Sequence, residues 1–132
     1  MARLSAMSEF NETLVRRYFE LDGYLVRTNV RYPVPNGYSD VDLVGFNPRT
    51  GDAVAVEVKG WHNEPLTMGT FTSWPNLLNF ANDAATAAIR SILGERSFRR
   101  ILVVSRLGSG SSDPVRAYLS QRHVDVIDFP AV

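Results

Sequence analysis

Acidic residues and a lysine alternate with apolar residues in two neighbouring segments of the chain. Asp40 and Asp42 flank a valine in segment 38–46, and Glu57 and Lys59 flank another valine in segment 53–59. Side chains two residues apart share one face of a strand, so each segment would carry its polar residues on one face. Lys59 is the single lysine among the 14 basic residues of the chain.

The turn between these segments predicts how their side chains meet. Residues 47–52 are rich in turn formers, which favours an antiparallel hairpin. A hairpin closed around 48–51 places Asp42 opposite Glu57 and Asp40 opposite Lys59. Opposed Cβ atoms lie about 4.5–5.5 Å apart, and like charges at this distance destabilise a sheet. One bulged residue would change this pairing.

Two opposed carboxylates can hold a hard divalent cation. Mg²⁺ binds through one or two protein carboxylates, activates water and stabilises a leaving oxygen. Lys59 would add a compact positive charge, so the set predicts hydrolysis of a phosphodiester. In the alternative interpretation Asp40 and Lys59 form a surface ion pair, and the other carboxylates are solvated without a ligand. The apolar residues beside the acids favour central strands and the metal site.

Asp42 in one segment and Glu57-Val58-Lys59 in the next resemble the motif of the PD-(D/E)xK nuclease superfamily. The resemblance implies a restriction-endonuclease-like αβββαβ core with a C-terminal αβ extension. It implies that Asp42, Glu57 and the backbone carbonyl of Val58 bind Mg²⁺, for which Mn²⁺ substitutes. Lys59 would be the catalytic lysine, and Glu12 matches the helical glutamate that often completes the metal shell. By itself Glu12 also suits the first turn of a helix.

Two subfamilies share parts of this pattern. The set is similar to archaeal-type Holliday-junction resolvases, and residues 57–61 are similar to the nuclease-related domain called NERD. The chain departs from the superfamily pattern because no proline precedes Asp40 or Asp42. The helix expected at 75–93 also carries no additional lysine or glutamine motif. The subfamily therefore stays open.

Several further residues are candidate substrate contacts. Trp61 and His62 directly follow the motif, although a tryptophan also packs readily over the end of a sheet. Asp40 is a candidate accessory ligand. The arginines could line a surface for a nucleic-acid backbone or could form ordinary solvated faces, and they are Arg16, Arg17, Arg27, Arg31, Arg96, Arg99, Arg100 and Arg106.

The hydropathy pattern predicts one α/β domain, 1–132, with a mixed sheet. Phe10, Leu14, Tyr18 and Leu21 recur at helical spacing before Gly23. The expected helices are 8–22, 75–93 and 113–122; the expected strands are 24–34, 38–46, 53–59, 101–105 and 124–129; residues 60–74 are expected to be irregular.

Composition excludes several classes of protein. The chain has no cysteine, which excludes disulfides and thiolate zinc sites. The N-terminus lacks the apolar core of a signal peptide, and no apolar run approaches the roughly 20 residues of a membrane span. These features favour a cytoplasmic protein. A formal net charge of zero argues against long-range attraction to nucleic acid, although a local basic patch could still bind it.

Together these patterns predict a metal-dependent DNA endonuclease, resolvase-like or associated with restriction or repair. A junction, a flap, a restriction site and RNA in place of DNA all stay open as substrates. A homodimer is expected because a small domain presents little surface for a duplex, and a helicase or methylase is a candidate partner. The alternative is a non-catalytic binding module, or a subunit of a larger nucleic-acid-processing complex, that kept the nuclease fold. A small-molecule phosphohydrolase is a more distant alternative.

Overall fold

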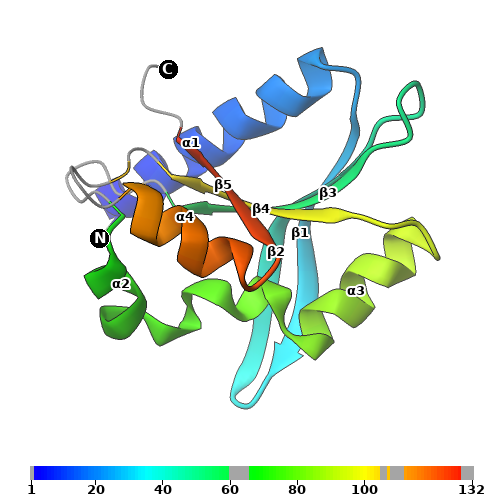
Figure 1. Cartoon of the computed structure of the whole chain (residues 1–132). Coiled ribbons are helices and arrows are strands. Elements are labelled where there is room, and N and C mark those ends of the chain that lie inside the picture. Colours follow the sequence, from blue (N-terminus) through cyan, green and yellow to red (C-terminus); the bar gives the residue numbers. More distant parts are fainter. Residues whose placement is uncertain (1, 60–65, 105–106, 108–111, 129–132) are drawn as a thin grey trace.

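The computed structural model describes residues 2–59, 66–104, 107 and 112–128, and it describes the side chains of the first helix from Glu12 onward. The strands follow the predicted order, with three consecutive strands after the first helix, but three helical segments instead of one predicted helix lie between the third and fourth strands (Figure 1). Their bounds are α1 (Ala2–Leu21), β1 (Leu25–Val34), β2 (Gly37–Phe46), β3 (Ala53–Lys59), α2 (Met68–Ser73), the 3₁₀ helix η1 (Pro75–Ala81), α3 (Asp83–Leu93), β4 (Arg99–Val104), α4 (Ser112–Ser120) and β5 (Val124–Asp128).

The described strands form a five-stranded sheet in the order β1-β2-β3-β4-β5. Strands β1, β2 and β3 pair antiparallel, as a meander with short turns. Strands β3, β4 and β5 pair parallel, because helices cross over between them. The sheet is therefore mixed, which confirms the predicted α/β class, and its strand pairing is consistent with a restriction-endonuclease-like core.

Helices cover both faces of this sheet (Figure 1). On one face, Val15 and Phe19 of α1 pack with Val54 and Val56 of β3. On the other face, η1, α3 and α4 pack their apolar side chains on the sheet. Both faces of β3 are buried, since every residue from 53 to 58 is buried. The prediction that the acidic segments are inner strands is thus confirmed.

Helix α1 is longer than the predicted 8–22, since it begins at Ala2. Its sheet-facing residues Val15 and Phe19 are buried, whereas Tyr18 is 49% exposed and Leu21 is 89% exposed. Gly23 has a φ of +97°, a left-handed conformation that favours glycine after a helix. No helix within the described ranges is both long and apolar enough to cross a membrane.

The predicted single helix at 75–93 is wrong. The segment divides at Asn82, whose extended backbone separates η1 from α3. The Asn82 side chain accepts a hydrogen bond from the Ala85 backbone N–H at 2.8 Å, so it caps α3. The predicted irregular stretch 60–74 contains α2, which follows Thr67. Residues 60–65 of that stretch lie outside the described residues.

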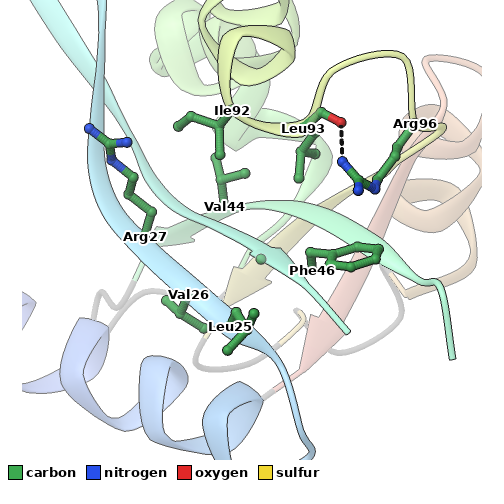
Figure 2. Close-up of a pocket in the computed structure, with 9 residues that line it drawn as sticks. Leu25, Val26, Arg27, Val44, Phe46, Ile92, Leu93 and Arg96 are labelled. Carbon is green, nitrogen blue, oxygen red and sulfur yellow. Dashed lines mark hydrogen bonds between the residues drawn. The ribbon is translucent and has the colours of Figure 1, made fainter. Parts of the chain in front are cut away.

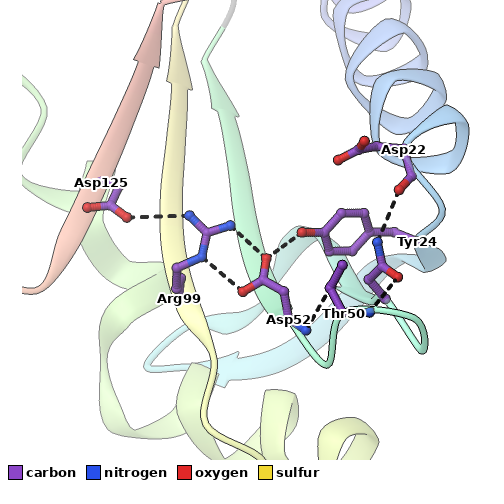
Figure 3. A network of polar contacts seen from close by, with 7 residues as sticks. Asp22, Tyr24, Thr50, Asp52, Arg99 and Asp125 are labelled. Carbon is purple, nitrogen blue, oxygen red and sulfur yellow. Dashed lines mark hydrogen bonds and ion pairs between the residues drawn. The ribbon is translucent and has the colours of Figure 1, made fainter.

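A polar network ties together the amino ends of β3 and β4 (Figure 3). Arg99 donates to both oxygens of Asp52, at 3.1 Å and 2.7 Å, and lies 3.7 Å from Asp125 of β5. The Tyr24 hydroxyl donates to the same Asp52 carboxylate. Strand β4 begins at Arg99, two residues before its predicted start, and there Arg99 pairs with Val54 of β3. The network lies at the amino end of β3, whereas Lys59 lies at the carboxyl end of the same strand.

Candidate metal centre

The pairing of β2 with β3 brings the predicted acidic residues to one level of the sheet. Leu43 pairs with Val56 and Phe46 pairs with Ala53, which is the register predicted from the turn. The same register continues to Asp42 opposite Glu57, but the regular pairing ends at Leu43 and Val56. The acidic residues therefore lie where the two strands begin to separate.

Asp42 holds the strands together at this point through its side chain. Its Oδ2 accepts a hydrogen bond from the backbone N–H of Val58 at 2.7 Å. In a regular ladder a backbone carbonyl of the neighbouring strand would accept this bond. The carboxylate of Asp42 takes that place, so it is fixed at the end of β3 and beside Glu57.

The two carboxyl groups repel each other when both are charged. Burial, the nearby charge of Glu57 and a hydrogen bond with Glu57 together raise the pKa of Asp42 to about 8. Hydrogen bonds with the Val58 backbone and the Glu12 side chain act in the opposite direction. Without a cation, burial and the neighbouring Glu57 therefore favour the protonated form of the Asp42 carboxyl group.

Glu57 is one of the few charged residues buried in the described chain, at 6% exposure. Burial raises the pKa of Glu57, while hydrogen bonding with Asp42 and the charge of Lys59 lower it. The Lys59 ammonium lies 3.7 Å from Glu57 Oε2, so the ion pair that the described residues form with Lys59 is to Glu57 and not to Asp40. Among the described residues, no group forms a hydrogen bond with the buried Glu57 Oε1.

A solvent-open cleft of about 360 Å³ lies beside the Asp42 carboxyl group, with Asp42 and Val58 in its lining. We call it the acidic cleft. Helix α1 contributes one wall and strands β1, β2 and β3 contribute the rest. Its lining residues are Glu12, Thr13, Arg16, Thr28, Asn29, Asp42, Leu43 and Val58.

Among these lining residues, the sequence predicts Arg16 only as part of a basic surface and does not predict Thr13, Thr28 or Asn29 as site residues. Arg16 is four residues after Glu12 and so shares its helix face, which is a signal that the sequence carries. Arg16 is also paired with Glu20 at 3.3 Å. Thr28 and Asn29 lie in the cleft because β1 pairs with β2 beside Asp42. No local sequence pattern predicts that these two residues line the cleft.

Asp42 of the acidic cleft and the neighbouring Glu57 together fit a hard cation. The described chain holds no cluster of three or more His, Cys, Asp or Glu side chains spaced to enclose a metal ion. A cation would instead be held by Asp42 and Glu57, by the predicted Val58 carbonyl and by water, which is the coordination that Mg²⁺ favours. The buried Glu57 Oε1, which lacks a hydrogen-bond partner among the described residues, supports this fit. A cation there would offset the repulsion between the two acids.

The structure separates other predicted contacts from this cleft. Arg27 lines a second pocket, of about 220 Å³, whose floor is largely apolar (Figure 2). Arg31 lies over the ring of Tyr38 at 4.8 Å, and it pairs in register with Asp40. Residues 61 and 62, which include the predicted Trp61 contact, lie outside the described residues.

Several arginines of the predicted basic surface have partners within the fold. Arg96 lies over the ring of Phe46 at 4.5 Å, beside the second pocket (Figure 2). Arg99 binds Asp52, and Arg100 donates to the Thr86 hydroxyl at 2.8 Å. These contacts favour structural roles for the three side chains.

Comparisons with known proteins support the fold. Neither protein-family models nor curated proteins match the chain. The crystal structure of a protein of unknown function, AF1548, matches with a TM-score of 0.55 and 16% identity, covering 93% of this chain and 59% of that chain. A repair endonuclease from Pyrococcus abyssi matches with a TM-score of 0.46 and 16% identity, covering 93% of this chain and 46% of that chain. The chain thus spans about half the length of these proteins, and at this identity a likeness shows the fold alone.

Proposed function

We propose that the chain is a metal-dependent phosphodiesterase that cleaves DNA, with the acidic cleft as its active site. The observation that carries this proposal is the pair of carboxylates. Asp42 and Glu57 are held side by side at the end of an inner strand, with Lys59 at 3.7 Å from Glu57. Two opposed acids destabilise a fold when both are charged, and a bound cation would offset that cost. The resemblance of the same residues to the PD-(D/E)xK motif supports the same chemistry.

Each residue has a distinct part in the proposed reaction. Mg²⁺, when bound by Asp42, Glu57 and the Val58 carbonyl, would polarise the phosphate and activate water. Asp42 must lose its proton before it can act as a ligand, and its bond from the Val58 N–H keeps the carboxylate in place. Lys59 would set its positive charge against the charge that develops on the phosphoryl oxygens. Glu12 would complete the ligand set from α1.

The substrate proposed here is DNA, acted on by two copies of the chain. A duplex presents two strands, and a dimer with twofold symmetry can place one acidic cleft on each strand. Light scattering that gives a monomer mass together with full cleavage of both strands would remove the dimer from this proposal. A helicase or methylase partner would supply specificity in addition.

The test is a cleavage panel of branched, linear and single-stranded DNA with Mg²⁺ or Mn²⁺. Wild type is expected to cleave at least one substrate, and Lys59→Ala and Glu57→Gln are expected to lose at least about 100-fold in rate. Asp125→Asn is the matched control, since Asp125 lies on β5 near the opposite edge of the sheet (Figure 3). If wild type binds DNA and cleaves none of the panel, the chain is a binding module and catalysis by this site is wrong.

A further inference from the structure

Asn29 has an unusual backbone conformation for its place in the fold. Among the described residues, Asn29, with a φ of +53°, and His123, with a φ of +58°, are the non-glycine residues with positive φ. The left-handed region costs an L-residue roughly 1–2 kcal/mol, and asparagine tolerates it better than most. His123 occupies a turn between α4 and β5, where such a conformation is common. Asn29 instead lies within the ten residues of strand β1.

The conformation of Asn29 coincides with a break in the pairing of β1 with β2. Thr28 pairs with Leu43 and Val30 pairs with Val41, but Asn29 and Asp42, which lie between these pairs, are not paired. The register is the same on both sides of the break, so neither strand gains or loses a residue there. The break is therefore a local rotation of the backbone and not a bulge.

Side chains change faces of the sheet at the same level. Val26 packs with Val15 and Phe19 of α1 on one face of the sheet. Val30, four residues further along β1, packs with the side chains of α3 on the opposite face. On β2, Leu43 and Val41 likewise belong to opposite clusters. A regular strand would put residues two or four apart on one face. At the level of Asn29 and Asp42, both strands thus exchange the faces of the sheet on which their side chains lie.

This rotation accounts for the position of the Asp42 carboxylate. A residue in a regular β2 would have its backbone paired with the neighbouring strands and its side chain directed out of the sheet, to one face. At the break the Asp42 side chain instead reaches the Val58 N–H of β3 at 2.7 Å. Asn29 and Asp42 both line the acidic cleft. Strained backbone conformations of this kind collect at functional sites.

We infer that Asn29 is a positioning residue of the acidic cleft. Its left-handed backbone breaks the β1–β2 ladder opposite Asp42 and so directs that carboxyl group to Val58, where it would also hold the cation of the proposed function. The catalytic consequence rests on the proposed function, whereas the link between Asn29 and the Asp42–Val58 bond does not. The backbone conformation carries the role, so glycine can replace asparagine there and a β-branched residue cannot.

Two pairs of variants test the inference. Asn29→Gly is expected to keep kcat within about threefold of wild type, because glycine adopts positive φ freely. Asn29→Val is expected to lower kcat or metal affinity by about 10- to 100-fold, the usual effect of losing the support of a ligand. His123→Gly and His123→Val are the matched controls: His123→Val carries a similar backbone penalty, so it should lower the Tm as Asn29→Val does and leave kcat unchanged.

A second measurement reads the Asp42–Val58 bond without cleavage. Amide hydrogen exchange of Val58 in the metal-free protein is expected to be slow in wild type, Asn29→Gly and His123→Val, and at least about tenfold faster in Asn29→Val. If Asn29→Val does not fold, Asn29→Ala replaces it, with the same direction expected. The inference is overturned if Asn29→Gly is as impaired as the bulkier variant, or if neither kcat nor Val58 exchange responds to the bulkier variant. If wild type cleaves no DNA while Val58 exchange follows the expected order, the proposed function falls and the inference about Asn29 stands.

Discussion

The carboxylate of Asp42 on β2 accepts a hydrogen bond of 2.7 Å from the backbone N–H of Val58 on β3. The bond forms just past Leu43 and Val56, where the regular pairing of these strands ends. A side-chain carboxyl oxygen therefore takes the place of a backbone carbonyl between two inner strands. Because the bond holds Asp42 next to buried Glu57, burial and the charge of Glu57 raise the pKa of Asp42. The pH dependence of stability and of cation binding should follow from this raised pKa.

The stability of the metal-free protein is expected to fall as the pH rises above about 4. Burial and the charge of Glu57 raise the pKa of Asp42 from 3.8 to about 8. Between these values the folded state keeps a proton that the unfolded chain releases, so the free energy of unfolding decreases with pH. Asp42→Asn removes this proton and should exceed wild type in stability at about pH 8.5, by on the order of 1–3 kcal/mol.

Urea unfolding of chelator-treated protein at about pH 5.5 and about pH 8.5 measures this effect. Asp40→Asn is the control, because Asp40 lies on the same strand and should leave the wild-type pH dependence in place. A wild-type stability that increases over this range, with Asp42→Asn following it in parallel, would contradict the prediction.

Divalent cations are expected to stabilise the protein more at high pH than at low pH. Mg²⁺ or Mn²⁺ must displace the protons that the metal-free cleft holds on its carboxyl groups, so binding strengthens as the pH rises. At a free concentration about 100 times the Kd, binding adds about 2.7 kcal/mol to the free energy of unfolding. Thermal melts with and without the cation, at matched ionic strength, measure the change. Glu57→Gln should abolish the shift, and a shift of equal size in that variant would place the cation elsewhere.

The network around Asp52 is expected to stabilise the sheet without affecting the cleft (Figure 3). Arg99→Ala removes both hydrogen bonds to Asp52 and should cost about 1 kcal/mol, a modest value because the Arg99 side chain is 51% exposed. The hydrogen bonds from Arg99 lower the pKa of Asp52, so their contribution is present above the ordinary value of 3.8 and is lost as the pH falls below it.

Denaturant titrations of wild type and Arg99→Ala from neutral pH to about pH 2.5 measure this difference. The two curves should converge at the acid end, where Asp52 is protonated. Cation binding at the acidic cleft should be equal in the two proteins. If the difference in stability between wild type and Arg99→Ala grows as the pH falls, Arg99 does not stabilise the sheet through Asp52.

The cap of α3 is expected to contribute measurably to stability. Asn82→Ala removes the acceptor for the Ala85 backbone N–H and should lower the free energy of unfolding by about 1 kcal/mol. Asn79→Ala in η1 is the matched control, because its side chain caps no helix. Chemical denaturation of both variants checks the prediction, and equal stability of the two would mean that Asn82 does not act through the cap.

The fold follows largely from local patterns, and its main exception has a local cause. Apolar alternation predicts β2 and β3 within one residue of their observed bounds, and the turn residues 47–52 predict their register. Apolar residues recur at helical spacing along segment 75–93, so its periodicity predicts one helix. Asn82 divides it, because its backbone is extended and its side chain accepts the Ala85 N–H at the start of α3.

By itself, the amino-acid sequence determined which residues can do chemistry and which of them face each other across the hairpin. Residue type, the two-residue period of a strand and the length of a turn are local properties, and they sufficed to place Asp42 level with Glu57. The tertiary structure alone decided how Asp42 meets Val58, that Glu12 approaches Asp42, and that Asn29 turns β1 over beside it. These relationships depend on packing α1 against the sheet and on a left-handed residue within a strand. Contacts between distant segments set that geometry, and no short stretch of the chain encodes it.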